Sequence, residues 1–248
     1  MELVQTASGG GQLVEEAMWQ VVFLIPKGVK DYYGIGLVEV VWKVVAAILN
    51  RRLIVSITFQ NFLHGFRSGR GTSTATPKAK LLQKLAALRE EVLYVIFLDL
   101  HKAYDALDRS RCLDILEGSG VGLQTCRLLQ TYCRWLTMVA SPGGYYRAEF
   151  QGARVVTQVD PLSPTIFNVV VDAVVRHWVT VMVEGAEDRG ECGQEGRHQN
   201  ALFYVKNGIV AFSDPLWIQG AFSTLVDLFD RVGLRTNFGK TAGMVCCP

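Results

Sequence analysis

The stretch FYVKNGIVAF, residues 203–212, decides how we expect this chain to fold. Two apolar runs flank a short polar segment centred on Asn207 and Gly208. An Asn-Gly pair between two apolar runs is the strongest short-range signal for a β-hairpin. We therefore predict a hairpin that turns at Asn207 and Gly208 and carries Lys206 and Asn207 at its tip.

The composition is that of a globular protein. The chain has 248 residues, of which 50% are hydrophobic and 19% are charged, and its formal net charge is +2. So small a net charge does not by itself indicate a nucleic-acid partner, but residues 64–84 contain basic residues and no acidic one. This basic segment predicts either a solvated helix face or a surface that binds nucleic acid. Its basic residues are Arg67, Arg70, Lys78, Lys80 and Lys84.

Cysteine spacing and apolar runs indicate an intracellular protein without a membrane span. The six cysteines show no paired spacing that would suit zinc, so we expect free thiols in a reducing compartment. No signal peptide is expected after Met1. Charged residues interrupt the apolar stretches 37–49 and 166–183, which is typical of buried helices.

The remaining pattern indicates an α+β fold, because strands and helices alternate without regular βαβ spacing. We expect a flexible lead-in at residues 1–18 and an exposed loop at 184–200. We expect strands at 21–25 and 92–98 and two short strands around a turn at 142–144. Helices are expected at 37–53, from Thr72 or Thr74 to about 90, at 109–118, at 124–138, from 165 onward and at 215–232.

Two segments contain side chains suited to chemistry. Asp99 follows the apolar run 92–98, and a carboxylate at such a place suits a hard divalent cation. Asp105 and Asp108 are equally suited to be turn and cap residues before the helix at 109. In the loop 154–164, Gln158 suits contact with a base edge, while the same loop also reads as a helix start capped by Ser163.

Taken in order, six segments resemble the reverse transcriptases of non-LTR retrotransposons and group II introns. The resemblance covers residues 19–245 and implies a polymerase palm, an antiparallel sheet with packed helices, joined to fingers. Residues 19–90 would be fingers-like and residues 91–248 palm-like, and the thumb would be missing. The segments are LIPK (24–27), HGFR with GRGT (64–67, 69–72), FLDL with KAYD (97–100, 102–105), TQVDPLSP with FN (157–164, 167–168), the Tyr204 hairpin, and Gly233-Leu234 with Asn237 and Lys240-Thr241.

The resemblance also implies roles for individual residues. Asp99 would be the first metal-binding carboxylate, for Mg²⁺, and Tyr104 the steric gate under the incoming sugar. Lys240 would lie near the leaving pyrophosphate. Lys27 and Arg67 would contact the triphosphate, and Gln158 the nascent base pair. The partners would be an RNA template and a DNA primer. The clustering of charge, and not the resemblance, makes Arg70, Lys78, Lys80 and Lys84 candidates for contact with nucleic acid.

This chain departs from the family at its catalytic positions. The family pattern Tyr-x-Asp-Asp is replaced by Tyr204-Val205-Lys206-Asn207, so the three expected metal ligands carry a formal charge of zero instead of −3. Val155 and Val159 stand where the family usually has glycine. We therefore predict a degenerate, catalytically inactive copy. Two alternatives remain open: an active enzyme that uses Asp214 or Asp160 as a ligand, and a non-catalytic module that binds nucleic acid or protein.

Overall fold

The computed structural model describes residues 19–26, 32–38, 40–135, 137–140, 148–151, 160–187 and 200–248. These residues form two compact units that are each discontinuous in sequence. The first unit combines residues up to Thr58 with Leu107–Phe167, and the second combines Phe59–Ala106 with Asn168–Pro248. The expected lead-in, residues 1–18, lies outside the described residues, and the division into fingers-like and palm-like regions stays a prediction.

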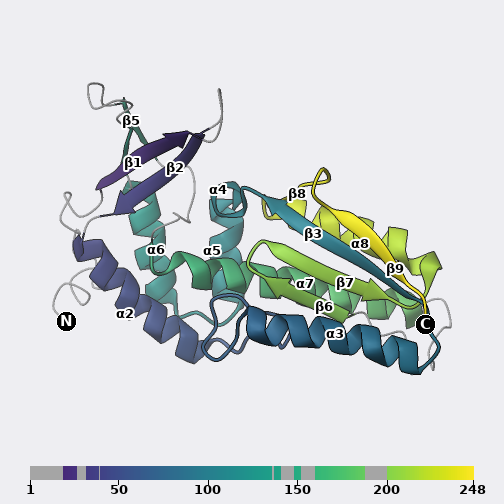
Figure 1. Cartoon of the computed structure of the whole chain (residues 1–248). Helices are drawn as coiled ribbons and strands as arrows, with labels where there is room; N and C mark the ends of the chain where they lie inside the picture. The colour runs from purple at the N-terminus through teal and green to yellow at the C-terminus, as the bar shows by residue number, and fades with distance from the viewer. Residues whose placement is uncertain are drawn as a thin grey trace. The chain divides into compact units, whose positions relative to one another are not determined.

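The first unit contains a four-stranded sheet in the order β2-β1-β4-β5 (Figure 1). Strand β1 pairs parallel with β4, while the other two pairings are antiparallel. Its strands are β1 (Trp19–Pro26), β2 (Tyr32–Val38), β4 (Thr137–Ala140) and β5 (Ala148–Gln151). Its helices are α2 (Val40–Ser56), α5 (Arg109–Gly118) and α6 (Leu123–Trp135).

Helix α2 supplies much of the core of the first unit. Trp42, Val45, Leu49 and Leu53 are buried and recur at helical spacing, so one face of α2 is apolar and covered. The Trp42 indole N–H donates to the Asp160 carboxylate at 2.7 Å. Because Asp160 is buried, this bond satisfies a polar group that would otherwise destabilise the core.

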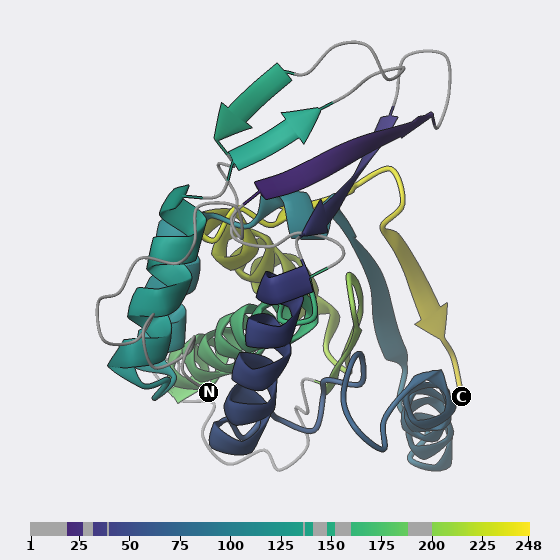
Figure 2. The same ribbon diagram turned by 90° about the vertical axis from the view of Figure 1, so that its left-hand side faces the viewer.

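The second unit is built on an antiparallel sheet in the order β6-β7-β3-β8, with β9 also paired to β3. Helices α7 and α8 cover one face of this sheet (Figure 2), and α3 runs beside β6 (Figure 1). The strands are β3 (Leu93–His101), β6 (Asn200–Tyr204), β7 (Asn207–Phe212), β8 (Arg235–Thr236) and β9 (Ala242–Cys246). The helices are α3 (Thr72–Leu88), α4 (Ala103–Ala106), α7 (Ser163–Glu187), which begins in the first unit, and α8 (Pro215–Arg231).

Aromatic side chains join the helices to the sheet in the second unit. The Phe203 ring lies between those of Phe62 and Phe229, at centroid distances of 6.4 and 5.9 Å. Trp178 of α7 packs edge-on against Phe212 and donates its indole N–H to the Ala221 carbonyl at 2.8 Å. By length and hydropathy alone the stretch Ser163–Glu184 of α7 suits a membrane span, yet 56% of it is buried within the protein. That burial agrees with the buried helix expected from the sequence.

The expectation of an α+β fold with an antiparallel sheet and packed helices is confirmed, but several element boundaries were wrong. Residues 37 and 38 belong to β2, because they pair with β1 instead of entering α2. Met138 lies in β4, not in α6. Helix α7 begins at Ser163, after Asp160 accepts the Leu162 N–H at 2.9 Å, and continues to residue 187.

The hairpin forms as expected, but its turn lies two residues earlier than predicted. Tyr204 pairs with Asn207, so the turn consists of Val205 and Lys206. Gly208 lies inside β7 opposite Phe203, where a Cβ atom would stand 2.5 Å from the Phe203 ring. The glycine is therefore required by a packing contact and not by the turn.

Candidate active site

The hairpin brings its turn to the side of Asp99. In the antiparallel pairing of β3 with β7, Asp99 stands opposite Asn207. The Leu100 N–H donates to the Lys206 carbonyl at 2.9 Å, which fixes the turn backbone against β3. The Lys206 ammonium consequently reaches the Asp99 carboxylate, with Nζ 3.3 Å from Oδ1.

Asp99 lies inside a strand, not just past its end as the sequence suggested. Strand β3 continues through Leu100 and His101, which pair with β8. Asp99 is 8% exposed, so both of its carboxylate oxygens need partners. Oδ1 has Lys206, and Oδ2 accepts the side-chain N–H of Asn237 at 3.0 Å.

Asn237 is a site residue that the sequence reasoning did not single out for a role. Its backbone N–H also donates to the Asp99 carbonyl at 2.8 Å, so it binds Asp99 twice. The turn that it begins is closed by bonds from the Lys240 and Thr241 N–H groups to the Asn237 carbonyl. The available signal was its place three residues before Lys240, in a segment that already supported the family resemblance.

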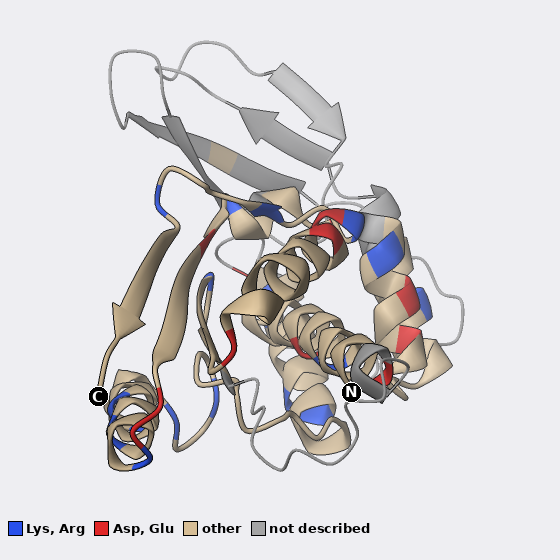
Figure 3. Ribbon diagram, turned by 90° about the vertical axis from the view of Figure 1, so that its right-hand side faces the viewer, with Lys and Arg blue, Asp and Glu red and all other residues tan. Residues whose placement is uncertain are grey.

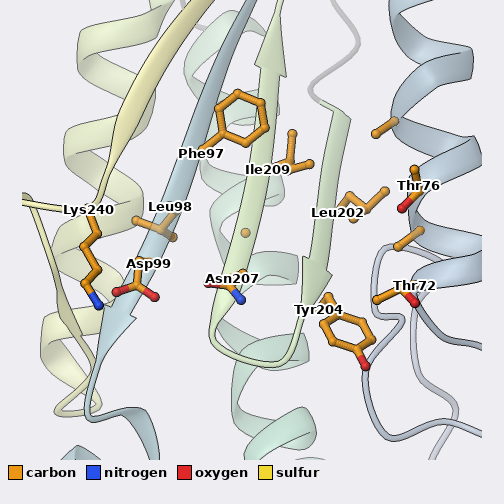
Figure 4. Close-up of a pocket in the computed structure, with 13 residues that line it drawn as sticks. Thr72, Thr76, Phe97, Leu98, Asp99, Leu202, Tyr204, Asn207, Ile209 and Lys240 are labelled. Carbon is orange, nitrogen blue, oxygen red and sulfur yellow. The ribbon is translucent and has the colours of Figure 1, made fainter. Parts of the chain in front are cut away.

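A cavity of about 400 Å³ lies beside Asp99 (Figure 4). Asp99, Asn207, Tyr204 and Lys240 contribute polar groups to it, and the Lys240 side chain extends toward Asp99. The other lining residues come from the open face of the sheet and from the first half of α3: Thr72, Ala75, Thr76, Ala79, Phe97, Leu98, Leu202, Gly208 and Ile209. The site thus combines one carboxylate and two lysines with an apolar wall.

Tyr104 lies in the short helix α4, directly after β3. Its side chain is half-buried, and burial raises the pKa of its hydroxyl to about 12. Asp108 is the cap of α5, as one of the two sequence interpretations held, because its carboxylate accepts the Arg111 N–H at 3.0 Å. This bond, with that from the Ser110 hydroxyl, lowers the pKa of Asp108.

Arg67 and its basic neighbours donate to a loop of their own unit. The Arg67 guanidinium donates to the carbonyls of Gln60 and Leu63, at 2.7 and 3.1 Å, and lies over the Phe59 ring. The pKa of Arg67 is lowered mainly by burial and to a smaller extent by the nearby charge of Arg70.

Two further basic residues converge on one loop residue, Asn61. Arg70 donates to both the backbone and the side-chain oxygen of Asn61, and Lys78 donates to its carbonyl at 3.2 Å. Lys80 and Lys84 instead face a second cavity, of about 440 Å³. Helix α3 carries lysines and no acidic residue along its length (Figure 3).

Four residues of interest lie outside the described residues, namely Lys27, Gln158, Val155 and Val159.

The two carboxylates considered as substitute ligands are engaged elsewhere. Asp214 caps α8 by accepting the Leu216 N–H. It lies just after Phe212, which pairs with Tyr94 of β3. Tyr94 is five residues along β3 from Asp99. That separation is roughly 17 Å at the rise of a β-strand. Asp160 belongs to the first unit and accepts from Trp42 and Leu162.

Within the part of the chain that the structure describes, no three Asp, Glu, His or Cys residues are grouped as a metal site would require. At Asp99 the partners are an ammonium and a carboxamide. Both are hydrogen-bond donors as they are oriented here, whereas Mg²⁺ needs oxygen ligands around it.

Comparison with known proteins places the chain in one family. The family model described as reverse transcriptase (RNA-dependent DNA polymerase) matches residues 25–246. The chain is 26% identical over 221 residues to the Pol polyprotein of the type-2 retrotransposable element R2DM of Drosophila melanogaster, covering 87% of this chain and 20% of that protein. It is 32% identical over 130 residues to the Pol polyprotein of the type-1 retrotransposable element R2 of Nasonia vitripennis, covering 48% and 12%. The chain thus spans a fifth or less of the retrotransposon proteins that it matches.

Solved structures show the same fold at low sequence identity. The chain is similar to telomerase from Candida tropicalis in complex with the TWJ fragment of telomeric RNA, with a TM-score of 0.66 and 13% identity over 94% of this chain and 42% of that one. It is similar also to the apo telomerase of that organism truncated from its C-terminal domain, with a TM-score of 0.64 and 13% identity over 94% and 51%. Because the family model matches residues 25–246, nearly the whole chain, the chain belongs to the reverse transcriptase (RNA-dependent DNA polymerase) family.

Proposed function

We propose that the chain is the reverse transcriptase domain of an R2-like retroelement and that it has lost polymerase activity. The observation that carries this proposal is the contact between the Lys206 ammonium and the Asp99 carboxylate, 3.3 Å apart. A lysine stands there at a position where the family carries a metal-binding aspartate.

The chemistry of the family explains why this substitution matters. Phosphoryl transfer depends on positioning the reacting groups and neutralising charge, which two metal ions held by carboxylates supply. At the three expected ligand positions, Asp99 contributes −1, Lys206 contributes +1 and Asn207 contributes nothing. The net charge of zero leaves nothing to hold two divalent cations.

The position of Lys206 adds repulsion to the missing charge. Two like unit charges 4 Å apart repel by about 4 kcal/mol at an effective dielectric constant near 20, and a divalent ion doubles that figure. Lys206 would have to leave Asp99 before a metal ion approached, and Asn237 would still donate to the other oxygen. The residues present therefore do not fit Mg²⁺.

The other roles implied by the resemblance are part of the same proposal. Lys240 faces the cavity beside Asp99, where an anionic leaving group would lie in an active relative. Tyr104 follows β3 closely enough to act as a steric gate for a sugar. Lys27 and Gln158 lie outside the described residues, and their contacts with the triphosphate and the base pair stay predictions. The guanidinium of Arg67 is engaged with loop carbonyls, which favours a structural role for it.

Primer extension on a primed RNA template tests the proposal. We expect no product from the natural chain with either Mg²⁺ or Mn²⁺. Robust extension by the natural chain would refute the loss of activity.

A variant with both aspartates restored tests whether the two substitutions at the hairpin, and not some other change, prevent metal binding. The double change Lys206→Asp with Asn207→Asp returns the formal charge of the three positions to −3. We expect it to bind Mn²⁺ measurably in calorimetry, while the natural chain does not. The matched control adds Asp99→Asn to the restored variant and should abolish that binding, and equal Mn²⁺ binding by the natural and restored chains would contradict the charge argument.

A second candidate function is binding of nucleic acid without chemistry. The observation that favours it is the set of lysines on α3, of which Lys80 and Lys84 are exposed and have no acidic residue on their own helix. Such binding is electrostatic and weakens steeply as salt rises, because each neutralised phosphate releases counterions. Binding that is absent or insensitive to salt would count against this function.

A further inference from the structure

The loop between α2 and α3 pairs with the hairpin just before its turn. We call residues 59–71 the seat loop. The Phe203 N–H donates to the Phe62 carbonyl at 2.7 Å, and the His64 N–H donates to the Phe203 carbonyl at 2.8 Å. Leu63 forms a parallel bridge with Phe203. Phe203 is therefore hydrogen-bonded on the side of β6 that β7 does not occupy, two residues before the turn begins at Val205.

The seat loop also touches the turn itself, through Gly65. A Cβ atom at Gly65 would lie 2.7 Å from the backbone nitrogen of Val205 and 2.9 Å from its Cγ2. Real Cβ atoms do not approach a backbone nitrogen so closely, so only glycine fits here. The Asn168 side chain holds this glycine in place by donating to its carbonyl at 2.8 Å.

Val205 has a backbone conformation that needs support from its surroundings. Its φ is 55°, in the left-handed region where a β-branched residue is strained. Strain of this kind persists only when neighbouring structure holds the residue in place. Two residues that contact the backbone of this turn are Gly65 of the seat loop and Leu100 of β3.

Side-chain hydrogen bonds hold the seat loop itself in place. The loop is bonded by two of its own arginines and by side chains of α3 and α7, which leaves few conformations open to it. The bonds are those of Arg67 with Phe59, Gln60 and Leu63, of Arg70 and Lys78 with Asn61, of Asp172 with the Gln60 N–H, and of Thr74 with the His64 ring.

We propose that the seat loop positions the hairpin turn, and that Gly65 is the positioning residue through which it holds Lys206 at Asp99. The loop fixes Phe203 and packs Gly65 against Val205, and Val205 then directs Lys206 toward Asp99. The basic residues Arg67, Arg70 and Lys78 act by holding the loop. The proposal concerns the turn used in the proposed function, but it requires neither activity nor its loss.

Hydrogen exchange of the Gly65→Ala variant tests the proposal. The Leu100 N–H reports on the turn, since it donates to the Lys206 carbonyl. We expect its exchange to become at least tenfold faster, because the added methyl group displaces the Val205 backbone. Gly71→Ala is the matched control, since it alters the same loop where the nearest atom to a Cβ is 3.8 Å away, and it should leave Leu100 unchanged.

Amides of α8 distinguish a displaced turn from general loss of stability. The proposal requires Leu100 to exchange faster while the slowest amides of α8 change much less. Adding Val205→Gly to Gly65→Ala should recover part of the protection, because it removes Cγ2 and relieves the left-handed φ. Unchanged exchange at Leu100, or an equal increase at Leu100 and in α8, would overturn the proposal. Polymerase activity in the natural chain would leave this result unaffected.

Discussion

At Gly208 the backbone of β7 passes directly over the ring of Phe203, and this close approach yields a prediction at the scale of one residue. Phe203 is fully buried, so its ring has no room to move away from an added methyl group. We expect Gly208→Ala to lower the free energy of unfolding by about 1–3 kcal/mol, the usual range for overpacking a core. Urea denaturation measures it.

Gly243→Ala is the control for that change. Gly243 also lies in a strand of the same sheet, but nothing stands within 4 Å of its Cβ position. Its substitution should alter stability by less than about 0.5 kcal/mol. Equal effects at the two glycines would show that the approach to Phe203 is not the reason for Gly208.

Tyr104 provides a pH-dependent prediction at the same scale. Burial raises the pKa of its hydroxyl to about 12, above the value near 10 of an exposed tyrosine. The folded state therefore retains this proton longer than the unfolded state, and the stability that it contributes is lost as pH rises from about 10 to about 12. The natural chain should therefore lose stability relative to Tyr104→Phe over that window. A constant difference would contradict the shifted pKa.

At the scale of elements, helix α5 depends on its N-terminal cap. The Asp108 carboxylate accepts the Arg111 N–H and the Ser110 hydroxyl. We expect Asp108→Ala to cost about 1 kcal/mol of stability, whereas Asp114→Ala, which removes the same charge from an exposed position on α5, should cost much less. Urea denaturation at neutral pH compares the free energies of unfolding of the two variants.

The same cap predicts an acid-sensitive contribution. The pKa of Asp108 is lowered in the folded state, so its contribution is present above the unfolded pKa and is lost as pH falls through the folded pKa. The stability gap between the natural chain and Asp108→Ala should therefore narrow at acid pH. A gap that widens on acidification would show that the carboxylate does not stabilise the helix as an anion.

The hairpin illustrates which features of a structural element can be predicted from the sequence. The two apolar runs predicted the strands correctly, because both strands are buried along most of their length and such burial leaves continuous apolar runs in the sequence. The position of the turn was wrong, because the Asn-Gly rule assumes that glycine serves the turn. Here Gly208 serves the packing of Phe203, and the left-handed residue is Val205, which touches the seat loop. The position of the seat loop against Val205 is not local in sequence.

At the scale of the whole molecule, the charge of α3 predicts salt-dependent binding of nucleic acid. Removing Lys80 and Lys84 together should reduce the slope of log affinity against log salt by about 0.9 for every duplex phosphate that the variant no longer neutralises. Filter binding at several salt concentrations measures the slope. The control removes the same charge from α2 with Arg51→Ala and Arg52→Ala, and an equal reduction of slope in the control would show that α3 is not a distinct binding surface.

The sequence by itself determined the α+β class, the order of most helices and strands, and the zero formal charge at the three expected ligand positions. These follow from local periodicity, from cap and turn residues, and from residue identity. Only the tertiary structure decided that Lys206 contacts Asp99, that Asn237 takes the other carboxylate oxygen, and that Gly65 packs against Val205. Each of these interactions joins segments far apart in the chain, and their distances depend on strand register and loop packing, which no local pattern of residues specifies.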